Sequence, residues 1–193
     1  LLNTIDCYQE WFADDASGLG KLVELRKWWD RLAEVGPKQG YFPKPSKCWL
    51  VVKNASDVDR AKEIFHGTGV NITVEGRRIL GAAIGTTQYV ESYVSSHVNE
   101  WIKELSTLSE MGKSEPHLAY SVFRVVQRCK WSFLMRTLKN ISHLFQPLEN
   151  AIRIFIESIT DVELTEESRE IMELPCNMGG LGISNPVKQA DIE

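Results

Sequence analysis

The chain has 193 residues, a formal net charge of −4, 43% hydrophobic residues and 25% charged residues. These values are close to the averages of globular proteins, so they exclude wholesale disorder and predict one buried core or two small ones. No apolar run approaches the roughly 20 residues that cross a bilayer, and the four cysteines form no Cys-x-x-Cys pair of the kind found in zinc sites. We therefore expect no membrane contact and an intracellular location, cytoplasmic or nuclear.

The first 85 residues alternate between strand and helix patterns. Residues 5–19 predict two short strands joined by the acidic turn Asp14-Asp15. From 19 to 35 apolar residues recur every three or four positions, which predicts an amphipathic helix with Trp28-Trp29 in the core. Further elements are predicted as strands at 49–52, 70–74 and 78–84, and as a short helix at 58–65 with Ser56 and Asp59 as a capping box.

After Gly85 the apolar spacing predicts only helices. Three prolines and one candidate N-cap mark where these helices begin or end: Pro116, Pro147, Thr165 and Pro175. The sequence therefore predicts an α+β protein, with antiparallel strands and helices in residues 1–85 and an all-helical region in residues 86–193.

Charge is distributed unevenly along the chain. Residues 1–85 hold 12 Lys and Arg against 11 Asp and Glu, whereas from Glu149 onward ten acidic residues face three basic ones. Between them, residues 113–139 hold Glu115 and six basic residues: Lys113, Arg124, Arg128, Lys130, Arg136 and Lys139. This basic segment can hold phosphates or be a solvated helix face, and the acidic segment can be a solvated helix or a contact for a lost domain.

The pair Asp14-Asp15 is the constellation with the clearest chemical meaning. Two carboxylates at a tight turn offer the oxygen ligands that Mg²⁺ prefers. In nucleotidyl transfer, two such ions activate the attacking 3'-hydroxyl and stabilise the leaving oxygen. The same dipeptide is also common in turns with no catalytic role.

Three motifs in order, and a later run, resemble those of reverse transcriptases, the RNA-directed DNA polymerases encoded by retroelements without long terminal repeats, such as retrotransposons, or by related elements. Phe12-Ala13-Asp14-Asp15 matches the aromatic-x-Asp-Asp box of that family. The run from Gly40 to Lys47 resembles the next motif, although Lys44 stands where asparagine is common, and Ile79-Leu80-Gly81 resembles the hairpin that grips the primer. The run from Leu174 to Ile183 is similar to one found after the thumb of such proteins.

The resemblance implies a partial polymerase palm in residues 1–85 and a thumb-like region in residues 86–193. It makes Asp14 and Asp15 catalytic ligands of Mg²⁺, with Asp14 the more direct one, and it puts Lys47 beside the leaving pyrophosphate. For Lys47 an ordinary solvated loop lysine stays open. The other implied contacts are a primer grip at Leu80 and Gly81 and nucleic-acid-binding residues at Arg124, Arg128, Lys130, Arg136 and Lys139.

The implied partners are an RNA or DNA primer-template, deoxynucleotides and an upstream polymerase half. Family members also use an aspartate on a strand well upstream and basic residues in the fingers, and the 13 residues before Asp14 provide neither. The chain opens Leu1-Leu2 and its first methionine is Met111, so we expect a fragment. Because the upstream aspartate and the fingers are missing, we expect this fragment to be inactive alone.

Two other readings stay open. The first is a noncatalytic module derived from a retroelement that binds nucleic acid or protein. The second is an unrelated α/β domain, which would be favoured if Asp14-Asp15 lay outside a strand-turn-strand hairpin.

Overall fold

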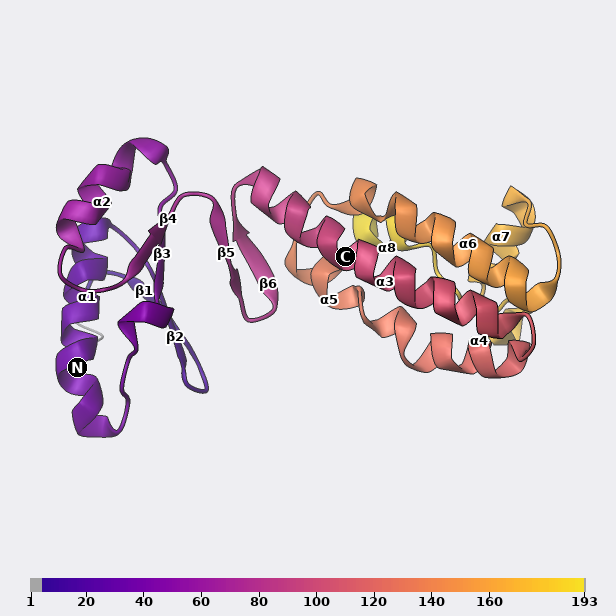
Figure 1. The fold of residues 1–193 in the computed structure, drawn as a ribbon, viewed down its shortest axis with the longest axis horizontal. Helices are drawn as coiled ribbons and strands as arrows, with labels where there is room; N and C mark the ends of the chain where they lie inside the picture. The colour runs from indigo at the N-terminus through magenta and orange to yellow at the C-terminus, as the bar shows by residue number, and fades with distance from the viewer. Residues whose placement is uncertain (1–4, 193) are drawn as a thin grey trace. The chain divides into compact units, whose positions relative to one another are not determined.

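The structure, a computed structural model, describes residues 5–192, apart from the side chains of Arg128 and Asp191. The chain is an α+β protein that divides into two compact units, one ending at Arg77 and the other beginning at Arg78 (Figure 1). Within the described residues, none of the helices is both long and apolar enough to span a membrane.

The first unit opens with an antiparallel hairpin of β1 (Tyr8–Phe12) and β2 (Asp15–Leu19). Phe12 pairs with Asp15, so the connecting loop is the two residues Ala13 and Asp14. One face of the hairpin packs on the following helix, where Trp28 Nε1 donates a hydrogen bond to Gln9 Oε1 at 3.0 Å. The predicted strand-turn-strand arrangement is confirmed.

Helix α1 (Leu22–Val35) and the 3₁₀ helix η1 (Gly36–Gln39) follow the hairpin. The helical spacing of its apolar residues gives α1 a buried side, on which Trp28 and Trp29 are each 8% exposed. The prediction that both tryptophans belong to the core is confirmed.

Strands β3 (Trp49–Val51) and β4 (Asn71–Thr73) form a two-stranded parallel sheet. They are joined through η3 (Ala55–Asp57) and α2 (Val58–Ile64), and a helical crossover of this kind returns the chain in the same direction. The expected antiparallel pairing is therefore wrong for these strands. The expected capping box is also wrong, since α2 has no side-chain cap. The core of this unit contains Trp29, Leu50, Val52, Ala61 and Phe65.

Strands β5 (Gly76–Ile79) and β6 (Ala82–Gly85) form a separate two-stranded sheet, where a single strand over 78–84 was predicted. The interruption lies at Leu80 and Gly81, whose φ angles are 47° and 88°. Two successive residues with positive φ are typical of the tight turn that joins hairpin strands. The prediction of an uninterrupted strand is therefore wrong. The hairpin predicted at Ile79-Leu80-Gly81 is present.

The second unit is built around α3 (Thr87–Gly112) and α6 (Gln146–Thr160), which pack side by side (Figure 1). Their buried residues form one core with α4 (Pro116–Val125) and α5 (Ser132–Thr137). The predicted helix starts near Pro116 and Pro147 are confirmed. The connecting 3₁₀ helices are η4 (Gln127–Cys129) and η5 (Ser142–Phe145).

Helix α7 (Glu166–Glu173) begins as predicted, because Thr165 accepts a hydrogen bond from the backbone N–H of Ser168 at 3.2 Å. It ends before Pro175, also as predicted. A 3₁₀ helix η6 (Cys176–Met178) and a last helix α8 (Pro186–Ile192) follow. Helix α8 has no counterpart in the sequence prediction.

A buried ion pair joins α6 to α7. Arg169 donates from Nε and Nη2 to the two carboxylate oxygens of Glu149 at 2.7 and 2.8 Å, and the two residues are 1% and 2% exposed. Arg169 Nη1 also donates to the carbonyl oxygen of Ile183 at 2.8 Å. The acidic segment thus begins with a core residue rather than a solvated one.

Candidate functional site

The two aspartates lie at the tip of the β1–β2 hairpin. Asp14 is the second loop residue and Asp15 is the first residue of β2, and both are exposed. Ala13, directly before them, has a φ of 51°, a left-handed conformation that is uncommon for a residue with a side chain. The tight loop thus places two consecutive aspartates at the surface.

Tyr41 packs against this hairpin from the loop that follows η1. Its ring meets Trp11 edge-on, with ring centroids 5.6 Å apart and planes at 69°. The backbone N–H of Tyr41 donates to the carbonyl oxygen of Gly36 at 2.9 Å. A Cβ on Gly36 would lie 2.7 Å from the Tyr41 carbonyl oxygen, so only glycine fits at that position.

The electrostatic environment of Tyr41 ties it to the acidic turn. Burial raises the pKa of its phenol, and the negative charges of Cys48, Asp15 and Asp14 raise it further. The Tyr41 side chain is therefore within electrostatic reach of both carboxylates. Sequence patterns alone give Tyr41 no role, although it lies in the run from Gly40 to Lys47 that follows the acidic turn.

Lys47 lies on the same loop, at the end of the 3₁₀ helix η2 (Pro45–Lys47). Its side chain is exposed. Its backbone N–H donates to the Lys44 carbonyl oxygen at 2.9 Å. Asn71 fixes the loop to β4 by donating from Nδ2 to the carbonyl oxygens of Ser46 and Cys48 at 2.9 and 3.1 Å. The acidic turn, Tyr41 and the loop that carries Lys47 thus belong to the same unit.

Leu80 and Gly81 belong to the second unit as the turn between β5 and β6. Tyr93 of α3 donates its hydroxyl to the Gly81 carbonyl oxygen at 2.7 Å. A Cβ on Gly81 would lie 3.2 Å from the ring of Phe133 on α5. The turn is therefore anchored on two helices, while Leu80 itself is 54% exposed.

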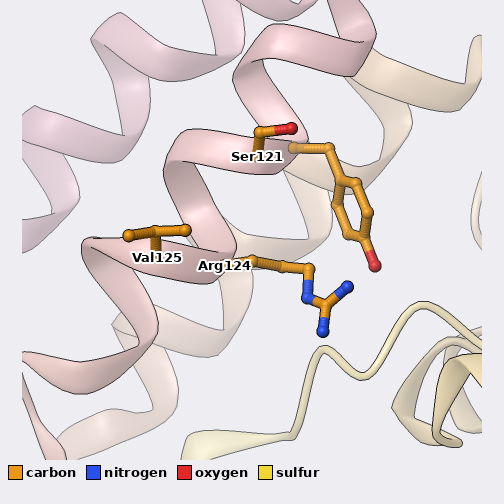
Figure 2. A pocket seen from close by; sticks show the side chains of 4 residues that line it. Ser121, Arg124 and Val125 are labelled. Atoms are coloured by element: carbon orange, nitrogen blue, oxygen red, sulfur yellow. The ribbon is translucent and has the colours of Figure 1, made fainter.

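Arg124 lies on α4 beside a cavity of about 260 Å³ that is lined by Tyr120, Ser121, Arg124 and Val125. Figure 2 shows Arg124 and Val125 projecting from neighbouring positions of the helix, with Ser121 one turn earlier. The guanidinium carbon is 5.8 Å from the centre of the Tyr120 ring. Within residues 5–192 no carboxylate forms an ion pair with Arg124, so its charge is available to an anion.

The other members of the predicted basic set differ in their surroundings. Lys130 forms an ion pair with Glu104, which also accepts a hydrogen bond from Gln127 Nε2 at 3.0 Å. The bond from Lys130 lowers the pKa of the Glu104 carboxyl, so a phosphate would compete with a carboxylate for this lysine. Arg136 donates from Nε to the Ser132 carbonyl oxygen at 3.3 Å, and Lys139 is exposed. The side chain of Arg128 lies outside the described part of the chain.

The run from Leu174 to Ile183 has a structural explanation. A Cβ on Gly180 would lie 2.1 Å from the Leu174 carbonyl oxygen, so the chain passes too close for any side chain. The Leu181 carbonyl oxygen accepts a hydrogen bond from the Tyr120 hydroxyl at 2.5 Å, and that of Ile183 accepts one from Arg169. These two hydrogen bonds connect the run to α4 and α7.

The donor chemistry at the acidic turn fits Mg²⁺ in part. Mg²⁺ is commonly held by one or two carboxylates together with substrate phosphates, and Asp14 and Asp15 provide two carboxylates. Among residues 5–192 no group of three or more His, Cys, Asp or Glu side chains is placed to hold a metal ion. The pair can therefore hold an ion only jointly with other ligands.

No protein-family model, curated protein or solved structure matches this chain.

Proposed function

We propose that this chain is the palm and thumb-like part of a reverse transcriptase, which extends a primer 3'-hydroxyl by two-metal nucleotidyl transfer. The observation that carries the proposal is the acidic turn. Asp14 and Asp15 are exposed at the tip of a two-residue hairpin loop, and the loop that bears Lys47 packs against that hairpin through Tyr41. The motif order in the sequence supports the same assignment.

In this proposal each group of the first unit has one task. Asp14 and Asp15 bind Mg²⁺, which supplies charge for activating the 3'-hydroxyl and stabilising the leaving oxygen. Lys47 neutralises charge that develops on the leaving pyrophosphate or donates a proton to it. Tyr41 positions the loop that carries Lys47 by packing against Trp11 of the hairpin.

In the second unit, the primer grip would be the turn at Leu80 and Gly81. This turn is anchored by Tyr93, which leaves the Leu80 side chain exposed for contact with a ligand. Arg124 and Lys139 are the basic residues best suited to hold phosphates, because neither is engaged by a carboxylate within the described residues. Lys130 would first have to leave Glu104.

The test is primer extension with Mg²⁺ by the longest reading frame of the transcript that contains this chain. We expect extension by that protein, and a loss of at least about 100-fold in D14N and D15N, because each removes a metal ligand. The control is D59N, which removes a carboxylate of the same unit that is 99% exposed. Full extension by both D14N and D15N would contradict the proposal.

The alternative is a noncatalytic module that binds nucleic acid or protein. The observation that favours it is Arg124, whose guanidinium borders a cavity and has no carboxylate partner within residues 5–192. It predicts that the 193-residue chain binds a primer-template duplex equally well with and without the D14N substitution, and that the longer protein extends no primer.

A further inference from the structure

The outer face of the β3–β4 sheet carries an exposed aromatic ring with a guanidinium over it. Leu50 is only 9% exposed and faces the core, so its strand neighbour Trp49 points to the opposite side. Trp49 is 39% exposed, and the guanidinium carbon of Arg77 lies 4.2 Å from the centroid of its ring. This is the geometry of a cation-π contact, which gives the surface two adjacent planar groups.

The backbone next to Trp49 is held in place before any ligand arrives. Asn71 is the register partner of Trp49 in the parallel sheet. Its side-chain amide donates to the carbonyl oxygens of Ser46 and Cys48, just ahead of Trp49 in the chain. A ligand that binds here therefore loses little affinity to the ordering of a flexible segment.

The sequence around Trp49 is positive and has no acidic residues to neutralise it. From Gly36 to Lys53 the chain holds four lysines and no aspartate or glutamate. Lys38 approaches Glu34 at 3.9 Å, but within residues 5–192 no carboxylate pairs with Lys47 or Arg77. An aromatic ring among unpaired cations is a combination that suits a strand of phosphates and bases.

We propose that Trp49 and Arg77, here called the Trp49 surface, bind single-stranded nucleic acid. A base stacks against the Trp49 and Arg77 planes, and the Arg77 guanidinium pairs with a backbone phosphate. A single strand fits better than a duplex because its bases can unstack and present their faces, which a duplex keeps covered. The inference rests on the proposed function in taking nucleic acid as the ligand, and it adds a contact for an unpaired strand.

The experiment is fluorescence anisotropy of a labelled oligothymidylate of about 12 nucleotides, titrated with the 193-residue chain at several salt concentrations. We expect W49L to weaken binding about fivefold to 100-fold, the range measured for loss of one stacked base, while W49F keeps most of the affinity. R77Q should weaken binding and reduce the salt dependence by about one phosphate contact. The matched control is K62Q, which removes another exposed charge of the same unit.

Several outcomes would overturn the Trp49 surface: no binding of the oligothymidylate, equal binding by W49L and the parent chain, or a loss in K62Q as large as in R77Q. The unfolding curve of each variant shows whether it is folded. The altered residues, Trp49, Lys62 and Arg77, are all exposed. If extension depends on Asp14 and Asp15 while W49L binds normally, only this inference fails. If W49L and R77Q lose binding but no extension depends on the aspartates, the proposed function fails and the surface stands.

Discussion

At the acidic turn, the charges of Asp14 and Asp15 raise the pKa of Tyr41. Tyr41 combines partial burial with the fields of two carboxylates, and both effects disfavour its ionised form. The carboxylates are therefore linked to a group whose titration can be followed separately. Sequence patterns identified Asp14 and Asp15 because the dipeptide is a recognisable motif, but they gave Tyr41 no role because its contact with Trp11 depends on the folded loop.

D14N or D15N should lower the pKa of Tyr41. Each substitution removes a negative charge that opposes ionisation of the phenol, so the phenolate forms at lower pH than in the parent chain. The pKa should stay above the ordinary tyrosine value, since burial is the largest cause of the shift and is unchanged. Carbon-13 NMR of the Tyr41 ring during a pH titration measures this. An unchanged pKa in both variants, or an equal shift in the exposed control D59N, would contradict it.

At the scale of elements, local patterns predicted the helices well and the strand pairings poorly. Helix α3 follows directly from apolar residues at helical spacing, and α7 from the Thr165 cap, because both signals lie within the element. The parallel pairing of β3 with β4 depends on how α2 packs, which no short pattern encodes. At the β5–β6 turn the apolar run around Leu80 predicted an uninterrupted strand, because a local pattern does not reveal a positive φ, whereas the resemblance predicted the hairpin.

The two adjacent glycines of the run after α7 should differ sharply when replaced by alanine. A Cβ on Gly180 would clash with backbone oxygens of Leu174 and Ile171 at 2.1 and 2.5 Å, so we expect Gly180→Ala to cost about 3 kcal/mol. Gly179 has a φ of +87° but open space around it, so Gly179→Ala should cost only about 1 kcal/mol. Urea unfolding followed by circular dichroism measures both. Equal losses in the two variants would show that the close backbone contact is absent.

At the scale of the molecule, the feature most hidden from the sequence is the buried pair of Glu149 and Arg169. Glu149 lies in the first turn of α6 and Arg169 lies in α7, so the rest of α6 and a loop separate them along the chain. In the sequence, each looks like an ordinary solvated charge in a charged segment. Only the folded chain brings these two side chains together, at a place where both are almost fully buried. Residue spacing does not encode a long-range pair of this kind, so the charge pattern alone predicts either a solvated helix or a contact for a lost domain.

Glu149→Gln should destabilise the second unit by about 3–5 kcal/mol, because it leaves the buried Arg169 charge with only Glu173, which is 4.0 Å away and also paired with Lys188. The matched control is Glu166→Gln, which breaks an ion pair with Arg153 whose glutamate is 83% exposed, and which should cost at most about 1 kcal/mol. Replacing both buried partners, as in Glu149→Leu with Arg169→Met, should recover most of the loss. Thermal unfolding of the four proteins decides it, and similar melting temperatures for E149Q and E166Q would contradict the expectation.

The hydrogen bond from Arg169 to Ile183 affects which amino-acid substitutions this chain can accept during evolution. Arg169 serves two acceptors at once, the carboxylate of Glu149 and the carbonyl oxygen of Ile183. Replacing Arg169 alone would leave the buried Glu149 carboxylate without this partner and remove the hydrogen bond to Ile183. A substitution of Glu149 or Arg169 is therefore constrained by the other residue. Substitutions of Glu149 and Arg169 are therefore expected to be accepted together rather than singly.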